Sequence, residues 1–239
     1  MGFRIGLEGS DMLEWIVESR KDAITAEKLG ARRLELVSAN EVGGLTPSPG
    51  LIGDVLGYVA IDVQVMVRPH PYGFVYDDYD KEVMISDIAF LSDLGHERIV
   101  IGALQPAGMI DTAFLDRLFE EFPDLDVTFH RAFDRANDQL KAYETLLDYR
   151  KNIKRVLTSG GAENCADGID TLERLVELQK VTDGPIIMPG SGLSAKNIKE
   201  IHERIGADEY HFGSGVRENR SFENGFDEEA VKQIIDVLE

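Results

Sequence analysis

Short apolar runs alternate with longer amphipathic stretches along the whole chain, and their spacing is the feature that most constrains the fold. Eight runs have the character of β-strands, and equivalent points near their ends lie 24 to 35 residues apart. A strand, a helix and the next parallel strand together occupy about 30 residues. The predicted strands are Phe3–Glu8, Arg33–Val37, Asp62–Arg68, Arg98–Gly102, Asp126–His130, Lys154–Thr158, Pro185–Met188 and Glu209–Phe212.

Eight such units fill the 239 residues and predict one domain, a (β/α)₈ TIM-type barrel over residues 1–239. An open, doubly wound parallel sheet is the alternative, because a repeat count alone does not prove that the sheet closes. The first helix is expected in the apolar pattern that runs from Trp15 to the glycine stop at Gly30.

The charge of the chain excludes some partners. With 44 acidic and 25 basic residues the formal net charge is −19, so nucleic acid and anionic membranes are not expected to bind. No apolar run approaches the ~18 residues that a membrane-spanning helix needs. A single cysteine, Cys165, cannot form an internal disulfide, and a free thiol is typical of a reducing compartment. We therefore expect a cytoplasmic protein.

Strand alternation predicts which side chains face the barrel axis. The apolar face of each strand must meet the helices, which leaves the polar face for the axis. Near the N-terminal mouth, Arg4, Arg33 and Glu209 are expected to form a layer of ion pairs, because unpaired buried charges cost several kcal/mol each. The C-terminal mouth, where barrel active sites lie, is expected to hold the candidate catalytic residues Glu8, Glu35, Arg68, His130, Arg131 and His211.

These residues suit proton transfer and anion binding. Glu8 or Glu35 would act as a base, and His130 or His211 as an acid or an orienting group. Arg68 and Arg131 would clamp a carboxylate or phosphate. A structural role is the alternative in each case: the histidines would make fixed hydrogen bonds, and Arg68 would neutralise Glu35.

Three glycine-rich turns follow the last three predicted strands. Glycine lets the backbone approach an anion, and barrel enzymes often hold phosphate on the loops after strands 7 and 8. Plain tight turns would need the same glycines, so this alternative stays open. The predicted ligand- or phosphate-binding residues are Thr158, Ser159, Gly160, Gly161, Gly190, Ser191, Gly192, Gly213 and Ser214.

Several of these segments resemble the copper homeostasis protein CutC family. The resemblance runs in family order over nearly the whole chain. It implies a cytoplasmic (β/α)₈ barrel, often a homodimer, with a role in copper tolerance and copper trafficking. The segments that carry it are Leu34–Leu36, Gly43–Ser48, Met66–Pro69, Phe74–Tyr76, Thr128–Phe133, Leu157–Gly161 and Met188–Gly190 with Gly192.

The resemblance also concerns copper ligands. Family members commonly carry cysteines just after the glutamate of the first strand and directly after the Glu-Leu of the second, and these have been proposed to bind copper. Here the corresponding residues are Ser10 and Val37, which leaves Cys165 as the one thiol candidate. Copper as a cofactor therefore rests on the resemblance alone.

Three functions remain open at this point. The first is copper homeostasis of the CutC type. The second is an enzyme or sensor for a small phosphorylated or carboxylated metabolite bound at the C-terminal mouth. The third is a structural, dimeric partner protein whose polar mouth serves solubility.

Overall fold

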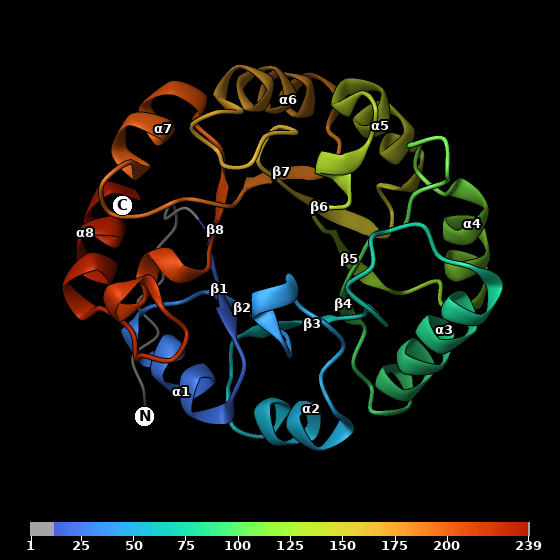
Figure 1. Cartoon of the computed structure of the whole chain (residues 1–239), viewed down its shortest axis with the longest axis horizontal. Helices are drawn as coiled ribbons and strands as arrows, with labels where there is room; N and C mark the ends of the chain where they lie inside the picture. Colours follow the sequence, from blue (N-terminus) through green and yellow to red (C-terminus); the bar gives the residue numbers. More distant parts are fainter. Residues whose placement is uncertain (1–11, 239) are drawn as a thin grey trace.

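The computed structural model describes residues 12–238, which form a ring of parallel strands surrounded by helices (Figure 1). The strands are β1 (Met12–Val17), β2 (Arg33–Leu36), β3 (Asp62–Met66), β4 (Arg98–Ile101), β5 (Asp126–Phe129), β6 (Ile153–Thr158), β7 (Ile186–Pro189) and β8 (Glu209–Phe212). The helices are α1 (Arg20–Leu29), α2 (Pro49–Leu56), α3 (Asp78–Asp93), α4 (Thr112–Glu121), α5 (Gln139–Leu146), α6 (Ile169–Thr182), α7 (Ile198–Ile205) and α8 (Glu228–Leu238). Short helical turns are η1 (Asn40–Val42), η2 (Phe133–Arg135), η3 (Leu147–Tyr149), η4 (Ser214–Val216) and η5 (Glu218–Arg220).

The sheet closes on itself. Its strands are paired in the order β7-β6-β5-β4-β3-β2-β1-β8, all in parallel. A parallel bridge between Gly190 and His211 joins the end of β7 to β8. The structure therefore confirms the predicted (β/α)₈ barrel and excludes the open, doubly wound alternative.

The first strand is the main difference from the sequence prediction. The predicted strand Phe3–Glu8 lies outside the described residues, and β1 is formed by Met12–Val17. Assigning Trp15 and Ile16 to the first helix was wrong: Leu13, Trp15 and Val17 alternate toward the helices and are buried. The Trp15 ring lies 5.4 Å from that of Phe226 just before α8. Helix α1 begins later, after its N-cap Ser19.

The remaining strands lie where the periodicity predicts them, with ends shifted by at most two residues. Helix α2 was not predicted, although Ser48 as N-cap and Pro49 at the first helical position are typical start signals. The apolar core lies between the strand ring and the helices. Within residues 12–238, none of the helices combines the length and apolar character needed to cross a membrane.

Candidate functional site

A chain of charged side chains crosses the interior of the barrel on β8, β1 and β2. The strand register places Glu14 beside both Arg33 and His211. Arg33 forms ion pairs with Glu14 and Glu209, as the alternation of β2 and β8 predicts for the last pair. On its other side, Glu14 Oε1 lies 2.8 Å from His211 Nδ1. His211 Nε2 in turn lies 3.7 Å from Glu35 Oε2, so the charge chain runs Glu209, Arg33, Glu14, His211, Glu35.

The charge chain sets the protonation of its members. Burial favours the neutral acid in Glu14, but the charges of Arg33 and His211 outweigh it and hold the pKa of Glu14 at about 2. Glu35 lies at the end of the chain, where burial raises its pKa to about 7; the nearby charge of Glu14 adds to this and His211 opposes it. The carboxylates Glu35 and Glu14 raise the pKa of His211 despite its burial.

Glu14, Glu35 and His211 lie close enough to share a cation, with one ligand atom of each within 4.8 Å of the others. Glu14 already forms an ion pair with Arg33 through Oε2, and its Oε1 accepts a hydrogen bond from His211 Nδ1. A cation here would have to displace an ion pair that is almost completely buried. We therefore assign this group to the charge chain rather than to a metal centre.

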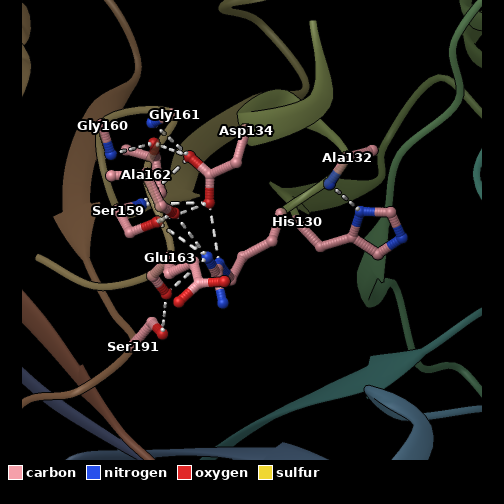
Figure 2. A network of polar contacts seen from close by, with 11 residues as sticks. His130, Ala132, Asp134, Ser159, Gly160, Gly161, Ala162, Glu163 and Ser191 are labelled. Carbon is pink, nitrogen blue, oxygen red and sulfur yellow. Dashed lines mark hydrogen bonds and ion pairs between the residues drawn. The ribbon is translucent and has the colours of Figure 1, made fainter. Parts of the chain in front are cut away.

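His130 follows β5 and lies on another part of the same mouth. Its Nδ1 accepts a hydrogen bond of 3.1 Å from the backbone N–H of Ala132 (Figure 2). The proton of the neutral ring must therefore be on Nε2, which is buried and has no hydrogen-bond partner in the described part of the chain. Burial, reinforced by the charge of Arg68, lowers the pKa of His130 to about 3. His130 is thus a neutral hydrogen-bond donor at Nε2.

Glycine at the end of β4 makes room for this histidine. A Cβ on Gly102 would lie 2.5 Å from His130 Nδ1, closer than side-chain atoms approach. A Cβ on Gly190 would lie 2.4 Å from Leu157 Cδ1 and 3.1 Å from the Cβ of His211. Glycine at both positions therefore serves close packing at the mouth, and at Gly102 the group that needs the space is the His130 ring.

Arg68, just after β3, holds the loop that follows β2. Its NH1 donates to the carbonyl oxygens of Val42, Gly43 and Gly44, each at 3.1 Å. The turn η1 in this loop lies over the centre of the strand ring (Figure 1). In the described part of the chain, no carboxylate lies within ion-pair distance of Arg68, so it does not neutralise Glu35 as the structural alternative supposed.

The loop after β6 is organised around a carboxylate from the loop after β5. The Asp134 carboxylate accepts hydrogen bonds from the backbone N–H groups of Ser159 and Gly161 and from the Thr158 hydroxyl (Figure 2). Arg131 Nε donates to the same carboxylate at 2.7 Å, and its NH2 to Ser159 Oγ at 2.7 Å. Two of the amides predicted to bind a ligand anion therefore already bind an internal one. Gly160 N–H donates to Thr158 Oγ1.

The loop after β7 has a strained backbone. Ser191 has a φ of 93°, a region that residues other than glycine rarely occupy. The Ser191 hydroxyl donates a hydrogen bond of 2.7 Å to the carbonyl oxygen of Glu163. The carbonyl oxygen of Ser191 accepts a hydrogen bond from the backbone N–H of Cys165. Ser191 therefore ties the β7 loop to the β6 loop at the edge of the mouth.

A cavity of about 1540 Å³ opens at the C-terminal mouth, and we refer to it as the mouth cavity. It brings together Glu35, Arg68, His130, Arg131 and His211, as the sequence predicts for their position. Of the predicted anion-binding residues, those that line it are Gly161, Ser191, Gly192, Gly213 and Ser214, whereas Thr158, Ser159, Gly160 and Gly190 are not among its lining residues. The catalytic and ligand-binding roles of all these residues stay predictions. Arg4 and Glu8 lie outside the described residues.

Two important residues were missed by sequence reasoning. Glu14 lies at the centre of the charge chain, and its signal is the similarity of Leu13-Glu14 to Leu34-Glu35 in the neighbouring strand. Asp134 closes the β6 loop. Its only sequence signal is an acidic residue shortly after the end of a strand, beside the predicted Arg131.

The residues at the mouth do not fit a thiolate copper site. Strand β1 is Met12–Val17, so the glutamate of the first strand is Glu14. The family's first cysteine position, just after that glutamate, therefore falls at Trp15 or Ile16, and its assignment to Ser10 was wrong. Ile16 packs with Val37, Met66 and Val100 in an apolar cluster. Cys165 is fully buried, and burial raises the pKa of its thiol to about 12. Cu(I) prefers thiolates and thioethers, and the part of the chain described here offers no thiolate at the cavity.

Comparison with known proteins identifies the family. The model of the CutC family matches residues 12–216. The human copper homeostasis protein cutC homolog is 39% identical over 208 residues, which cover 87% of this chain and 75% of that protein. A family protein CutC of Glaesserella parasuis is 37% identical, covering 84% and 82% of the two chains.

Solved structures agree with this result. A crystal structure described as a CutC copper homeostasis protein of Streptococcus agalactiae superposes with a TM-score of 0.78 at 31% identity, covering 85% of this chain and 98% of that one. N-(5'-phosphoribosyl)anthranilate isomerase of Pyrococcus furiosus has a TM-score of 0.59 at 14% identity, covering 95% and 98%, and shares the fold alone. The order of the strands, the residues that line the mouth and these matches lead to one conclusion: the chain belongs to the CutC family.

Proposed function

We propose that this protein serves copper homeostasis, the function for which its human and mouse CutC relatives are named. We further propose that it does so without carrying Cu(I) on thiolates. The family match over residues 12–216 supports the first part, because its relatives are named for copper homeostasis and not for the metabolite chemistry considered from the sequence. The second part is supported by the mouth cavity, whose charged lining offers oxygen and nitrogen donors while the single thiol is buried and protonated.

Copper tolerance of cells tests the role. Deleting the gene is expected to make the source cells more sensitive to copper, and the wild-type gene and a Cys165→Ser variant are expected to restore tolerance equally. Unchanged copper sensitivity after deletion would contradict the role. Restoration by the wild type but not by Cys165→Ser would contradict a thiol-free mechanism.

Direct binding is tested on the purified protein by equilibrium dialysis with Cu(I) against a competing chelator. We expect the protein to retain no more Cu(I) than a control sample from which the protein has been removed by denaturation. Stoichiometric Cu(I) that is lost on changing Cys165 or Met66 to Ala would show that the chain does carry the metal on sulfur.

Two further parts of the proposal come from the family resemblance, a cytoplasmic location and a homodimer. The free thiol of Cys165 is consistent with a reducing compartment. Cell fractionation tests the location, and light scattering of the eluting protein tests the assembly. A monomer at all concentrations, or recovery outside the cytoplasm, would contradict these parts.

A further inference from the structure

The mouth cavity contains three buried side chains that each keep one polar atom without a hydrogen-bond partner among residues 12–238. Glu35, His130 and Arg68 are 3%, 4% and 5% exposed, so all are more than nine-tenths buried. The atoms that find no partner in the part of the chain that the structure describes are Glu35 Oε1, His130 Nε2 and Arg68 Nε. A buried polar atom without a hydrogen bond costs about 1–3 kcal/mol, so three around one cavity call for a common explanation.

The three atoms are complementary in character. Glu35 Oε1 is an acceptor: it can take up a proton or accept a hydrogen bond from a donor group. His130 Nε2 carries the proton of a neutral imidazole, because Nδ1 accepts from Ala132, and it can donate to an oxygen. Arg68 Nε is a permanent N–H donor on a cation. A small molecule that satisfies all three must offer oxygen acceptors together with a hydrogen-bond donor or an acidic hydrogen.

Arg68 adds a requirement for negative charge. Its guanidinium is buried, and among the described residues it meets backbone carbonyls rather than a carboxylate. A buried cation without a counter-ion is costly, and an anionic ligand would remove that cost. Its central carbon lies 4.8 Å from the centre of the Phe74 ring, and that ring lies 5.0 Å from the ring of His130. Both donors thus adjoin an apolar wall, where hydrogen bonds to an anion are strong.

We infer that the mouth cavity is a proton-transfer site for a small carbonyl compound that carries a carboxylate or phosphate group. Glu35 removes a proton from the carbon next to the carbonyl. The electron pair of the broken C–H bond forms the C=C bond of an enolate, and the carbonyl π pair moves to oxygen. His130 Nε2–H donates to this oxygen, while Arg68 faces the anionic group. Glu35 then returns a proton to the same carbon and the carbonyl forms again, so that atoms and charge balance; in D₂O the acid proton of Glu35 first exchanges with solvent, and the carbon receives deuterium.

His211 and Glu14 act as positioning residues in this scheme. Glu14 fixes the His211 ring through Nδ1, and His211 Nε2 faces Glu35 at 3.7 Å. The charges around Glu35 come from Glu14 on β1, His211 on β8 and Arg33 on β2. Burial, with the charge of Glu14 adding to it and that of His211 opposing it, raises the pKa of Glu35 to about 7, which suits a base at neutral pH. The inference does not rest on the role in copper homeostasis.

The test is exchange of the carbon-bound hydrogen in D₂O, followed by ¹H NMR on the full-length protein. The probes are pyruvate and dihydroxyacetone phosphate, with uncharged dihydroxyacetone for comparison. We expect the wild type to accelerate exchange of at least one anionic probe, and the rate to rise with pH through about 7 as Glu35 loses its proton. Dihydroxyacetone should exchange more slowly than its phosphate.

Variants assign the roles. Glu35→Gln is expected to lower the exchange rate by about 10²–10⁴-fold, the usual contribution of a general base. His130→Ala should lower it by about 10²–10³-fold, and His130→Gln, which keeps an N–H donor, should lower it less. Glu41→Gln is the matched control, because this exposed glutamate in η1 does not line the cavity, and it should behave as the wild type.

Several results would overturn the inference. Wild-type exchange at the buffer rate with both anionic probes would reject the site. Wild-type rates in a folded Glu35→Gln variant would reject Glu35 as the base. If Glu35→Gln does not fold, the pH profile of the wild type decides: a rate with no rise between pH about 5 and 8 rejects the assignment. The copper-tolerance assay is independent, so either proposal can fail alone.

Discussion

Replacing Glu14 by Gln tests the charge chain at its centre. The change keeps the shape of the side chain and removes the charge that Arg33 and His211 share. The pKa of Glu14 is about 2 in the folded protein, against an ordinary value of 4.5. Each pKa unit corresponds to about 1.4 kcal/mol, so the charged form is stabilised by about 3 kcal/mol relative to the unfolded chain.

The sign of the pH dependence follows. A lowered carboxyl pKa stabilises the fold fully above pH 4.5, and this contribution is lost as the pH falls from 4.5 toward 2. At neutral pH we therefore expect Glu14→Gln to lower the free energy of unfolding by about 3 kcal/mol. The difference between variant and wild type should shrink as the pH falls through this window.

Urea unfolding followed by tryptophan fluorescence measures this directly. The chain has one tryptophan, Trp15, which is buried next to Glu14 in β1. Glu41→Gln, at an exposed position, is the control and should change stability by no more than about 0.5 kcal/mol. A Glu14→Gln effect as small as that of the control, or one that is constant from neutral pH to pH 3, would refute this explanation of the buried charges.

Three further predictions concern the surroundings of the mouth. Gly102→Ala places a Cβ where the His130 ring lies. We expect the free energy of unfolding to fall by about 1–3 kcal/mol and the His130 NMR signal to shift. An unmoved signal would contradict the role of Gly102 in positioning His130. Asp134→Asn weakens the hydrogen bonds to Ser159 and Gly161, so limited proteolysis should cut the 158–163 loop faster than in Asp138→Asn, an exposed N-cap control; equal rates would show that Asp134 does not hold the loop. Burial raises the pKa of Cys165 to about 12, so iodoacetamide near pH 8.5 should label the thiol only after denaturation, and fast labelling of the folded protein would contradict its burial.

Much of the fold could be predicted because periodicity is a local property. The strand from Glu209 to Phe212 has the bounds that its pattern predicts. The pairing of Arg33 with Glu209 also followed, since alternation placed both on the axis and buried charges need partners.

The first strand shows where local patterns fail. Trp15 and Ile16 fit an apolar helical stripe as well as they fit a strand, and a short apolar run does not decide between them. The barrel decides: β1 has to pair with both β2 and β8, and Met12–Val17 does so. This error hid Glu14 and gave its role to Glu8.

The site was predicted in position but not in its connections. Strand ends converge at one mouth of a barrel, so Glu35, Arg68, His130 and His211 could be placed together from sequence. That Asp134 occupies the amides of the β6 loop, and that Ala132 fixes the tautomer of His130, depends on loop conformations that no spacing encodes.

Titration of Glu35 and His130 by NMR tests the central idea most directly, namely that the buried charges prepare an acid–base pair at the mouth. With ¹³C-labelled glutamate and ¹⁵N-labelled histidine, we expect the Glu35 carboxyl to titrate at about 7, and His130 to stay neutral with its proton on Nε2 down to about pH 3. A Glu35 that titrates near 4.5 together with a His130 that titrates near 6.5 would contradict it.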